Sequence, residues 1–319
     1  MSTFENLLGH VIDLEFNTHE AMIEAALQWQ LEEYQLDNGT FRGYIKIVHT
    51  IHTQIANTYR SNGVFVKGNT PPNVYLFASG ESEGKMTHNG MNVLDDELVV
   101  LTDTDQLDFI LSSSVDDVIV AVDKDFFHTA FEKYFNRPFE YNALTKRIQL
   151  KDNTGKVFRS KLKDMLSDLI EQHEKLRNDP DFHAKSEEAI MQIVFDNLDF
   201  SKSRKDALES EINADKIRKH IEKNYKDNIS INKLCTNEKL SERTLRSGFK
   251  NLFGLSPKQY HKSFRLGKVH HAFLKADPTI DSVEQIAYEY GFTHMGRFAR
   301  NYKSMFGNTP SYTLTKCSF

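Results

Sequence analysis

SVEQIAYEYGFTHMGRFARNYKSMFGNTP, residues 282–310, decides how the C-terminal part of this chain folds. Apolar side chains recur in it at helical spacing in two stripes: Val283, Ile286, Ala287 and Tyr290, then Phe298, Tyr302, Met305 and Phe306. Ser282 and Gln285 are typical of a capping box at the start of the first helix, and Gly291 interrupts the pattern. The second helix carries Arg297 and Arg300 on its other face. Two short helices joined by a tight turn, with a basic outer face on the second, predict a helix-turn-helix.

The same arrangement occurs earlier in the chain. Ile231, Leu234 and Cys235 correspond to Val283, Ile286 and Ala287 of the first stripe, 52 residues later. Leu245, Phe249 and Phe253 correspond to Phe298, Tyr302 and Phe306 of the second stripe, 53 residues later. Both copies end alike, in Phe253-Gly254-Leu255-Ser256-Pro257 and Phe306-Gly307-Asn308-Thr309-Pro310. The Gly suits a helix C-cap, the Ser or Thr an N-cap, and the Pro a first helical position. A repeat that keeps both the apolar stripe and its capping residues predicts two helix-turn-helix units.

Residues 212–316 resemble the tandem helix-turn-helix DNA-binding domain of AraC/XylS-type bacterial transcription regulators. The residues that carry the resemblance are Ser241, Leu245, Phe249, Gly254, Pro257, Tyr260, Arg265-Leu266, Ile286-Ala287, Tyr290-Gly291-Phe292, Arg297-Phe298, Phe306-Gly307, Pro310 and Tyr312. The sequence departs from the family pattern at Cys235, His294 and Gly296. The resemblance implies a transcription regulator that binds double-stranded promoter DNA, contacts RNA polymerase, and forms a homodimer.

Charge divides the chain in two. From Glu211 onward there are 19 Lys and Arg against 10 Asp and Glu, a net charge of +9. The preceding residues have 21 against 35, a net charge of −14, which gives −5 for the whole chain. A basic C-terminal domain attached to an acidic one is typical of a phosphate-binding module joined to a domain with another task.

Composition favours a cytoplasmic protein. Two cysteines, Cys235 and Cys317, provide no disulfide framework. Residues 1–30 contain five acidic residues and no basic one, unlike a signal peptide. No stretch approaches 18 consecutive apolar residues, so the sequence predicts no membrane-spanning helix.

The first 125 residues are predicted to be rich in β-strands. Alternating apolar residues at Ile45, Ile47, Ile51 and Ile55, together with turn signals such as Asn62-Gly63, favour seven or eight short antiparallel strands. That number suits a small barrel or jelly roll. Trp29, Gly39-Thr40-Phe41-Arg42-Gly43 and Ser61-Asn62-Gly63 loosely resemble the cupin-like β-barrel sensor that family members often carry. The predicted fold class is therefore a two-domain α+β chain, with a cupin-like barrel and an all-α C-terminal domain.

Residues 126–200 are predicted to be helical. Phe158, Leu162, Met165, Leu166 and Leu169 form an apolar stripe that suits either the core of the domain or a dimer seam, and the family resemblance favours a dimer role. Residues 201–211 are polar and charged, as in a linker. We therefore expect a sensor and dimerisation domain over 1–200, the linker over 201–211, and a DNA-binding domain over 212–319.

The outward faces of the two recognition helices supply the candidate DNA contacts. They are Arg243, Thr244, Arg246, Ser247 and Lys250 on the first helix, and Thr293, His294, Gly296, Arg297, Arg300, Asn301 and Lys303 on or beside the second. Arginine pairs with two acceptors of guanine, so Arg243, Arg246, Arg297 and Arg300 are the predicted base readers. Lys250 is predicted to contact phosphate. The alternative for each residue is an ordinary solvated helix face.

No pattern predicts catalysis or a cofactor. His49 and His52 are three residues apart and would face opposite sides of one strand, and with His88 they are expected to be ordinary strand histidines without a metal. His270 and His271 are expected to be surface or packing residues. We therefore expect a regulator whose N-terminal domain senses an unidentified small molecule. The alternatives are a regulator controlled by abundance or by a protein partner, and a cupin-type enzyme with a DNA-binding appendage.

Overall fold

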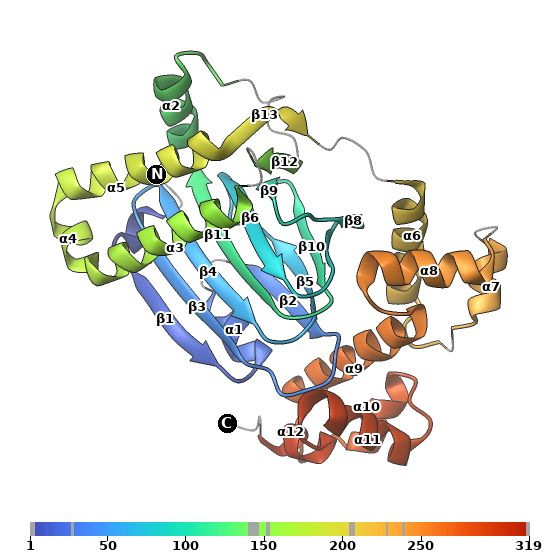
Figure 1. Cartoon of the computed structure of the whole chain (residues 1–319). Helices are drawn as coiled ribbons and strands as arrows, with labels where there is room; N and C mark the ends of the chain where they lie inside the picture. The colour runs from blue at the N-terminus through green and yellow to red at the C-terminus, as the bar shows by residue number, and fades with distance from the viewer. Residues whose placement is uncertain are drawn as a thin grey trace.

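The computed structural model describes residues 4–26, 29–139, 147–150, 154–203, 208–227, 229–237 and 240–316. A strand-rich N-terminal part lies beside an all-helical C-terminal part, as Figure 1 shows. This arrangement confirms the predicted two-domain α+β class. No helix in the described part of the chain is long and apolar enough to cross a membrane.

Two antiparallel sheets form the N-terminal part. In spatial order, the larger sheet contains β1 (Val11–Phe16), β3 (Gly43–His49), β4 (Thr53–Arg60), β11 (Val115–Asp123), β6 (Val74–Ser82), β9 (Glu97–Thr102), β12 (Arg147–Leu150) and β13 (Leu198–Ser203). The smaller sheet contains β2 (Gln30–Gln35), β5 (Val64–Asn69), β10 (Gln106–Leu111), β7 (Met86–His88) and β8 (Met91–Asn92). Neither sheet closes on itself within the described residues, so the expected barrel is an open pair of sheets.

The central strands of the larger sheet are buried on both faces, and β4 illustrates why. Its side chains alternate, so Ile55 points into a cluster formed with the covering helices while Ala56 points toward the smaller sheet. The covering helices are α2 (Lys124–Phe135), α3 (Gly155–Glu171), α4 (His173–Asn178) and α5 (Pro180–Asn197). A short helix, α1 (His19–Ala25), packs near the edge strands β1 and β2. Its N-cap is Thr18, whose hydroxyl accepts the Ala21 N–H at 3.3 Å.

The apolar stripe of α3 belongs to the core of the chain. Phe158, Leu162, Leu166 and Leu169 are each at most 1% exposed and pack against the larger sheet, while Met165 is half-buried. These four side chains are therefore unavailable to a second subunit. A dimer role for α3, which stays a prediction, would have to use the opposite face of the helix.

The C-terminal part consists of seven helices among the described residues. They are α6 (Glu209–Lys223), α7 (Ile231–Asn237), α8 (Glu242–Phe253), α9 (Pro257–Lys275), α10 (Val283–Glu289), α11 (Met295–Phe306) and α12 (Pro310–Lys316). Two separate apolar clusters hold the two helix-turn-helix units, and α9 contributes to both. The predicted linker, residues 201–211, overlaps the end of β13 and the start of α6, and residues 204–207 of it are outside the described residues.

Candidate functional site

The two recognition helices, α8 and α11, are fixed by matching local signals. Leu245 and Phe249 of α8 are buried, as are the corresponding Phe298 and Tyr302 of α11. Ser241 caps α8 by accepting the Thr244 N–H at 3.1 Å, whereas His294 at the same position before α11 makes no capping bond with its side chain. Each helix thus hides one face and presents the other.

The predicted DNA-contact residues lie on the presented faces. Ten are exposed and two half-buried: the exposed ones are Arg243, Thr244, Ser247, Lys250, Thr293, His294, Gly296, Arg297, Arg300 and Lys303, and the half-buried ones are Arg246 and Asn301. Arg246 donates from Nε to Glu242 one turn earlier, at 2.7 Å. A Cβ added at Gly296 would meet nothing within 4 Å, so packing inside the protein does not require glycine there.

Both recognition helices end against the N-terminal domain. The C-caps Gly254 and Gly307 have left-handed φ values of +70° and +77°, which favour glycine. They also approach other loops closely, since a Cβ on Gly254 would lie 2.6 Å from Ser112 and one on Gly307 would lie 2.7 Å from Thr40. The last turn of α11 is tied further, because the Met305 carbonyl accepts hydrogen bonds from Gln35 Nε2 at 2.7 Å and from the Gly39 N–H at 3.2 Å.

Arg218 of α6 joins the two domains through a buried charge cluster. Its guanidinium, on a side chain 1% exposed, contacts Asp108 of β10 at 2.7 Å, Asp215 at 2.6 Å and Glu222 at 2.8 Å. Tyr260 of α9 donates to Glu222 at 2.7 Å. Sequence reasoning missed this cluster, since nothing near Asp108 in the sequence indicates a partner 110 positions away.

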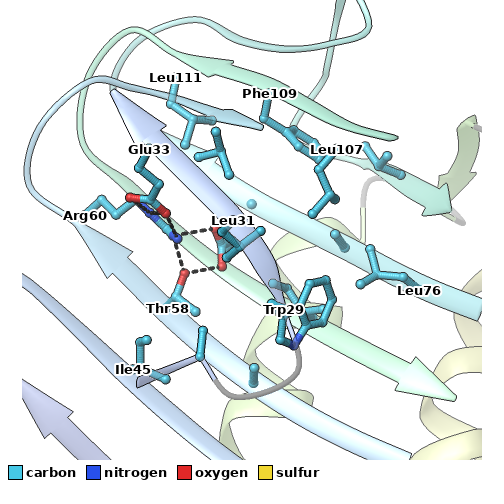
Figure 2. Close-up of a pocket in the computed structure, with 18 of the residues that line it drawn as sticks. Trp29, Leu31, Glu33, Ile45, Thr58, Arg60, Leu76, Leu107, Phe109 and Leu111 are labelled. Atoms are coloured by element: carbon cyan, nitrogen blue, oxygen red, sulfur yellow. Dashed lines mark hydrogen bonds and ion pairs between the residues drawn. The ribbon is translucent and has the colours of Figure 1, made fainter. Parts of the chain in front are cut away.

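A cavity of about 120 Å³ lies between the two sheets of the N-terminal domain (Figure 2). Its wall is mainly apolar and includes Trp29, Leu31, Ile45, Leu76 and Phe109. Helix α1 closes one side with Met22, Ile23 and Ala26. Sequence reasoning left the effector site unassigned, because lining residues that alternate along strands are visible only once the strands are placed.

One wall of this cavity carries a paired charge cluster. Arg60 contacts Glu33 Oε1 at 2.6 Å through Nη2 and donates to Thr58 at 2.6 Å through Nη1 (Figure 2). Burial alone would raise the pKa of Glu33, but attraction to Arg60 and hydrogen bonds from His19 and Arg60 lower it to about 2. Burial raises the pKa of Asp117, and Arg60 opposes that change only in part.

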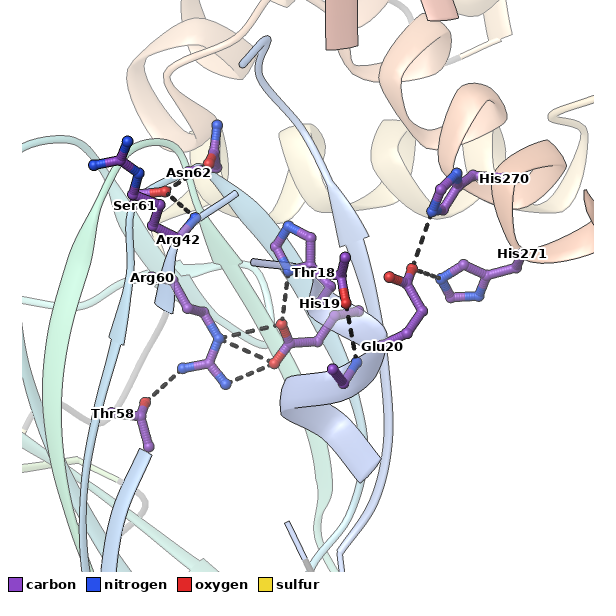
Figure 3. A network of polar contacts seen from close by, with 12 residues as sticks. Thr18, His19, Glu20, Arg42, Thr58, Arg60, Ser61, Asn62, His270 and His271 are labelled. Carbon is purple, nitrogen blue, oxygen red and sulfur yellow. Dashed lines mark hydrogen bonds and ion pairs between the residues drawn. The ribbon is translucent and has the colours of Figure 1, made fainter. Parts of the chain in front are cut away.

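Helix α1 connects this cluster to the C-terminal domain, as Figure 3 shows. His19 contacts Glu33 at 3.1 Å, while the next residue, Glu20, reaches His270 at 3.2 Å and His271 at 3.9 Å. His270 and His271 are adjacent on α9, so their side chains point in different directions. Both imidazoles nevertheless approach the carboxylate of Glu20 in the other domain. His270 continues the chain of contacts into α11, where its Nδ1 lies 2.5 Å from the hydroxyl of Tyr302.

The histidine and cysteine candidates of the described residues lie among ordinary contacts inside the protein. His52 and His183 both contact Glu187, which also accepts from Thr50 at 2.6 Å. Among the described residues, no group of three or more His, Cys, Asp or Glu is arranged to hold a metal ion. Cys235 is buried in the first helix-turn-helix, as its place in the apolar stripe predicts, and Cys317 lies outside the described residues.

Comparisons with known proteins point to one family. A family profile described as "Helix-turn-helix domain" matches residues 234–316. The XylDLEGF operon transcriptional activator 1 of Pseudomonas putida is 28% identical over 222 residues, which cover 69% of this chain and 67% of that protein. The XylDLEGF operon transcriptional activator 2 of the same organism is 33% identical over 122 residues, covering 38% of this chain and 78% of that protein.

Among solved structures, a probable AraC family transcriptional regulator from Rhodopseudomonas palustris CGA009 is 33% identical, with a TM-score of 0.31. The match covers 33% of this chain and 97% of that chain. The repeated helix-turn-helix, its basic outward faces and the two Pseudomonas putida relatives agree with the resemblance seen in the sequence. The chain belongs to the AraC/XylS family of transcription regulators.

Proposed function

We propose that α8 and α11 enter two successive major grooves on one face of promoter DNA, with Arg243, Arg246, Arg297 and Arg300 reading base edges. The observation that carries the proposal is the repeated pairing of a buried apolar stripe with an exposed basic face. Helix α9, which joins the two units, has 19 residues. That corresponds to roughly 28 Å of helix, similar to the 34 Å or so between successive grooves.

The other exposed residues have supporting roles in this proposal. Lys250, in the last turn of α8, contacts phosphate, and Thr244, Ser247, Thr293, His294, Asn301 and Lys303 contact phosphate or base edges. Glu242 holds Arg246 before DNA arrives and so limits the orientations that its guanidinium samples. Gly296 allows the DNA backbone to approach the first turn of α11, since the protein itself leaves that space open.

Substitution of Arg300 tests base reading. Arg300→Ala is expected to cost about 1–3 kcal/mol of binding to the preferred site and to relax preference at one base position. The matched control is Lys161→Ala, which removes an exposed charge from α3 in the other domain. Binding to a randomised DNA pool followed by sequencing measures both effects. A loss that is equal for all sequences would show that Arg300 is not a reader.

The effector site in this proposal is the cavity between the sheets. Strand β2 separates it from the DNA-binding domain, since Leu31 and Glu33 line the cavity while Tyr34 packs against α9 in a cluster shared with Phe264. An effector changes DNA affinity only through different affinity for two arrangements of the protein. Helix α1 and strand β2 touch both the cavity and the DNA-binding domain, and so do β5 and β10.

Glu20 tests this coupling. Glu20→Gln removes the charge that faces His270 and His271, so the effect of an active metabolite on DNA affinity is expected to shrink. Glu24→Gln, an exposed change on the same helix, is the control. Electrophoretic shift titrations with candidate metabolites measure the effect. A regulator controlled by abundance alone would respond to none of them.

A homodimer, contact with RNA polymerase, and the domain boundaries at residues 200 and 212 complete the proposal. They are supported by family membership and, for the boundaries, by the charge division of the sequence. Sedimentation equilibrium with and without an effector tests the dimer.

A further inference from the structure

The charges facing the cavity limit what it accepts, if the cavity is the effector site of the proposed function. Arg60 is the only basic side chain among the described residues that line it. Its Nε lies 3.0 and 3.2 Å from the two oxygens of Glu33, and Asp117 lies 3.6 Å from its Nη1. The one cation therefore already faces two carboxylates. An organic anion would have to displace Glu33 or enter beside both acidic groups, and either is unfavourable in a buried site.

A second polar residue of the cavity wall has a buried acceptor without a partner among the described residues. Gln54 is 2% exposed and lines the cavity from β4, and its buried amide oxygen accepts no hydrogen bond from any described residue. Along β4, residues 54, 56, 58 and 60 share one face, so Gln54 lies six residues from Arg60, roughly 20 Å at about 3.3 Å per residue. The unpaired acceptor is thus remote from the charge cluster. A buried acceptor of this kind favours a ligand that donates to it.

Size gives the third limit. The cavity measures about 120 Å³. An engineered apolar cavity of roughly 150 Å³ in another protein binds benzene. We infer that the effector is a small, uncharged, mainly apolar molecule of about one aromatic ring, which donates a hydrogen bond to the amide of Gln54, and that organic anions are rejected.

Three probes of similar size separate these properties: benzyl alcohol is neutral and donates, toluene is neutral without a donor, and benzoate is an anion. Titration calorimetry on the full chain is expected to show saturable binding of benzyl alcohol. Toluene should bind about five-fold more weakly, the effect of one neutral hydrogen bond, and benzoate at least a hundred-fold more weakly. These comparisons use the unaltered protein, so they do not depend on any variant folding.

Two variants locate the binding. Gln54→Leu is expected to equalise the affinities for benzyl alcohol and toluene, and Ala56→Leu, which fills the cavity wall, to abolish both. Benzoate binding as tightly as benzyl alcohol, equal affinities for benzyl alcohol and toluene in the unaltered protein, or no binding of any probe would each overturn the inference. DNA affinity is measured in the same samples. Binding in the expected order with unchanged DNA affinity would support the inference and refute the effector role of the cavity.

Discussion

Replacing Arg218 is expected to weaken the contact between the two domains and so to lower the free energy of unfolding. Arg218→Met keeps most of the side-chain volume but leaves Asp108, Asp215 and Glu222 close together without their shared cation. Removing one partner of a buried ion pair typically costs about 3–5 kcal/mol. The cost should fall at the upper end of that range, because three carboxylates lose their cation and, among the described residues, only Asp215 keeps another one, Lys219 at 2.8 Å. Single-domain stabilities are about 5–15 kcal/mol, so the loss is a large fraction of the total.

The effect of a second substitution, Asp108→Asn, on the free energy of unfolding should change sign when Arg218 is also replaced. In the unaltered chain, Asp108→Asn removes a charged hydrogen bond with Arg218 and should cost about 1.5–3 kcal/mol. In the Arg218→Met background the same change removes one of three repelling carboxylates, so it should stabilise the protein. Urea unfolding of the four proteins at pH 7 gives the cycle and its coupling energy. A cost below about 1 kcal/mol for Arg218→Met, or additive effects in the cycle, would refute the reasoning.

The pH dependence supplies an independent check. Burial raises the pKa of Glu222, although Arg218 and Tyr260 oppose that change. Without Arg218 the pKa of Glu222 should rise further above its unfolded value. A carboxyl group with a raised pKa destabilises the folded state at high pH, and the penalty disappears as pH falls and the group binds a proton. The stability gap between Arg218→Met and the unaltered chain should therefore narrow from pH 7 to pH 5.

Other predictions follow from single contacts. Lys250→Ala should weaken binding to all DNA sequences alike and reduce the salt slope by about one, while Lys161→Ala leaves the slope unchanged, as measured by titrations at several salt concentrations. Burial would raise the pKa of Glu187, but hydrogen bonds from two histidines and Thr50 lower it to about 2. Its contribution, at most about 3 kcal/mol, is present above pH 4.5 and lost toward pH 2, so Glu187→Gln should cost more at pH 7 than at pH 3 in urea unfolding. Gln35→Leu should speed hydrogen exchange in the last turn of α11 and leave the centre of the larger sheet unaffected, because a donor to that turn is lost.

The helical half of the molecule was predictable because its signals are local. Helix α9 begins at Pro257, the first helical position that the sequence predicts, since the N-cap Ser256 and the proline both act within a few residues. The strands β12 and β13 were missed for the opposite reason. They are short segments beside helices, and they become strands only because β12 pairs with β9 and β13 pairs with β12 at the edge of the larger sheet. Likewise, nothing near Glu20 in the sequence indicates a contact with His270.

The separation of the chain into a basic and an acidic part conceals a shared core. Tyr34, Leu36, Phe65 and Ile110 of the N-terminal sheet belong to the same apolar cluster as the first helix-turn-helix. A fragment lacking residues 1–205 would expose this surface of α6, α8 and α9 to water, and it would also lose the bonds that hold the end of α11. Because both recognition helices end on loops of the N-terminal domain, we expect a change of that domain to alter the relative position of α8 and α11 before DNA is bound. We therefore expect the N-terminal domain to act on DNA affinity through the spacing of α8 and α11, an effect that substitutions in the full chain isolate and truncation cannot.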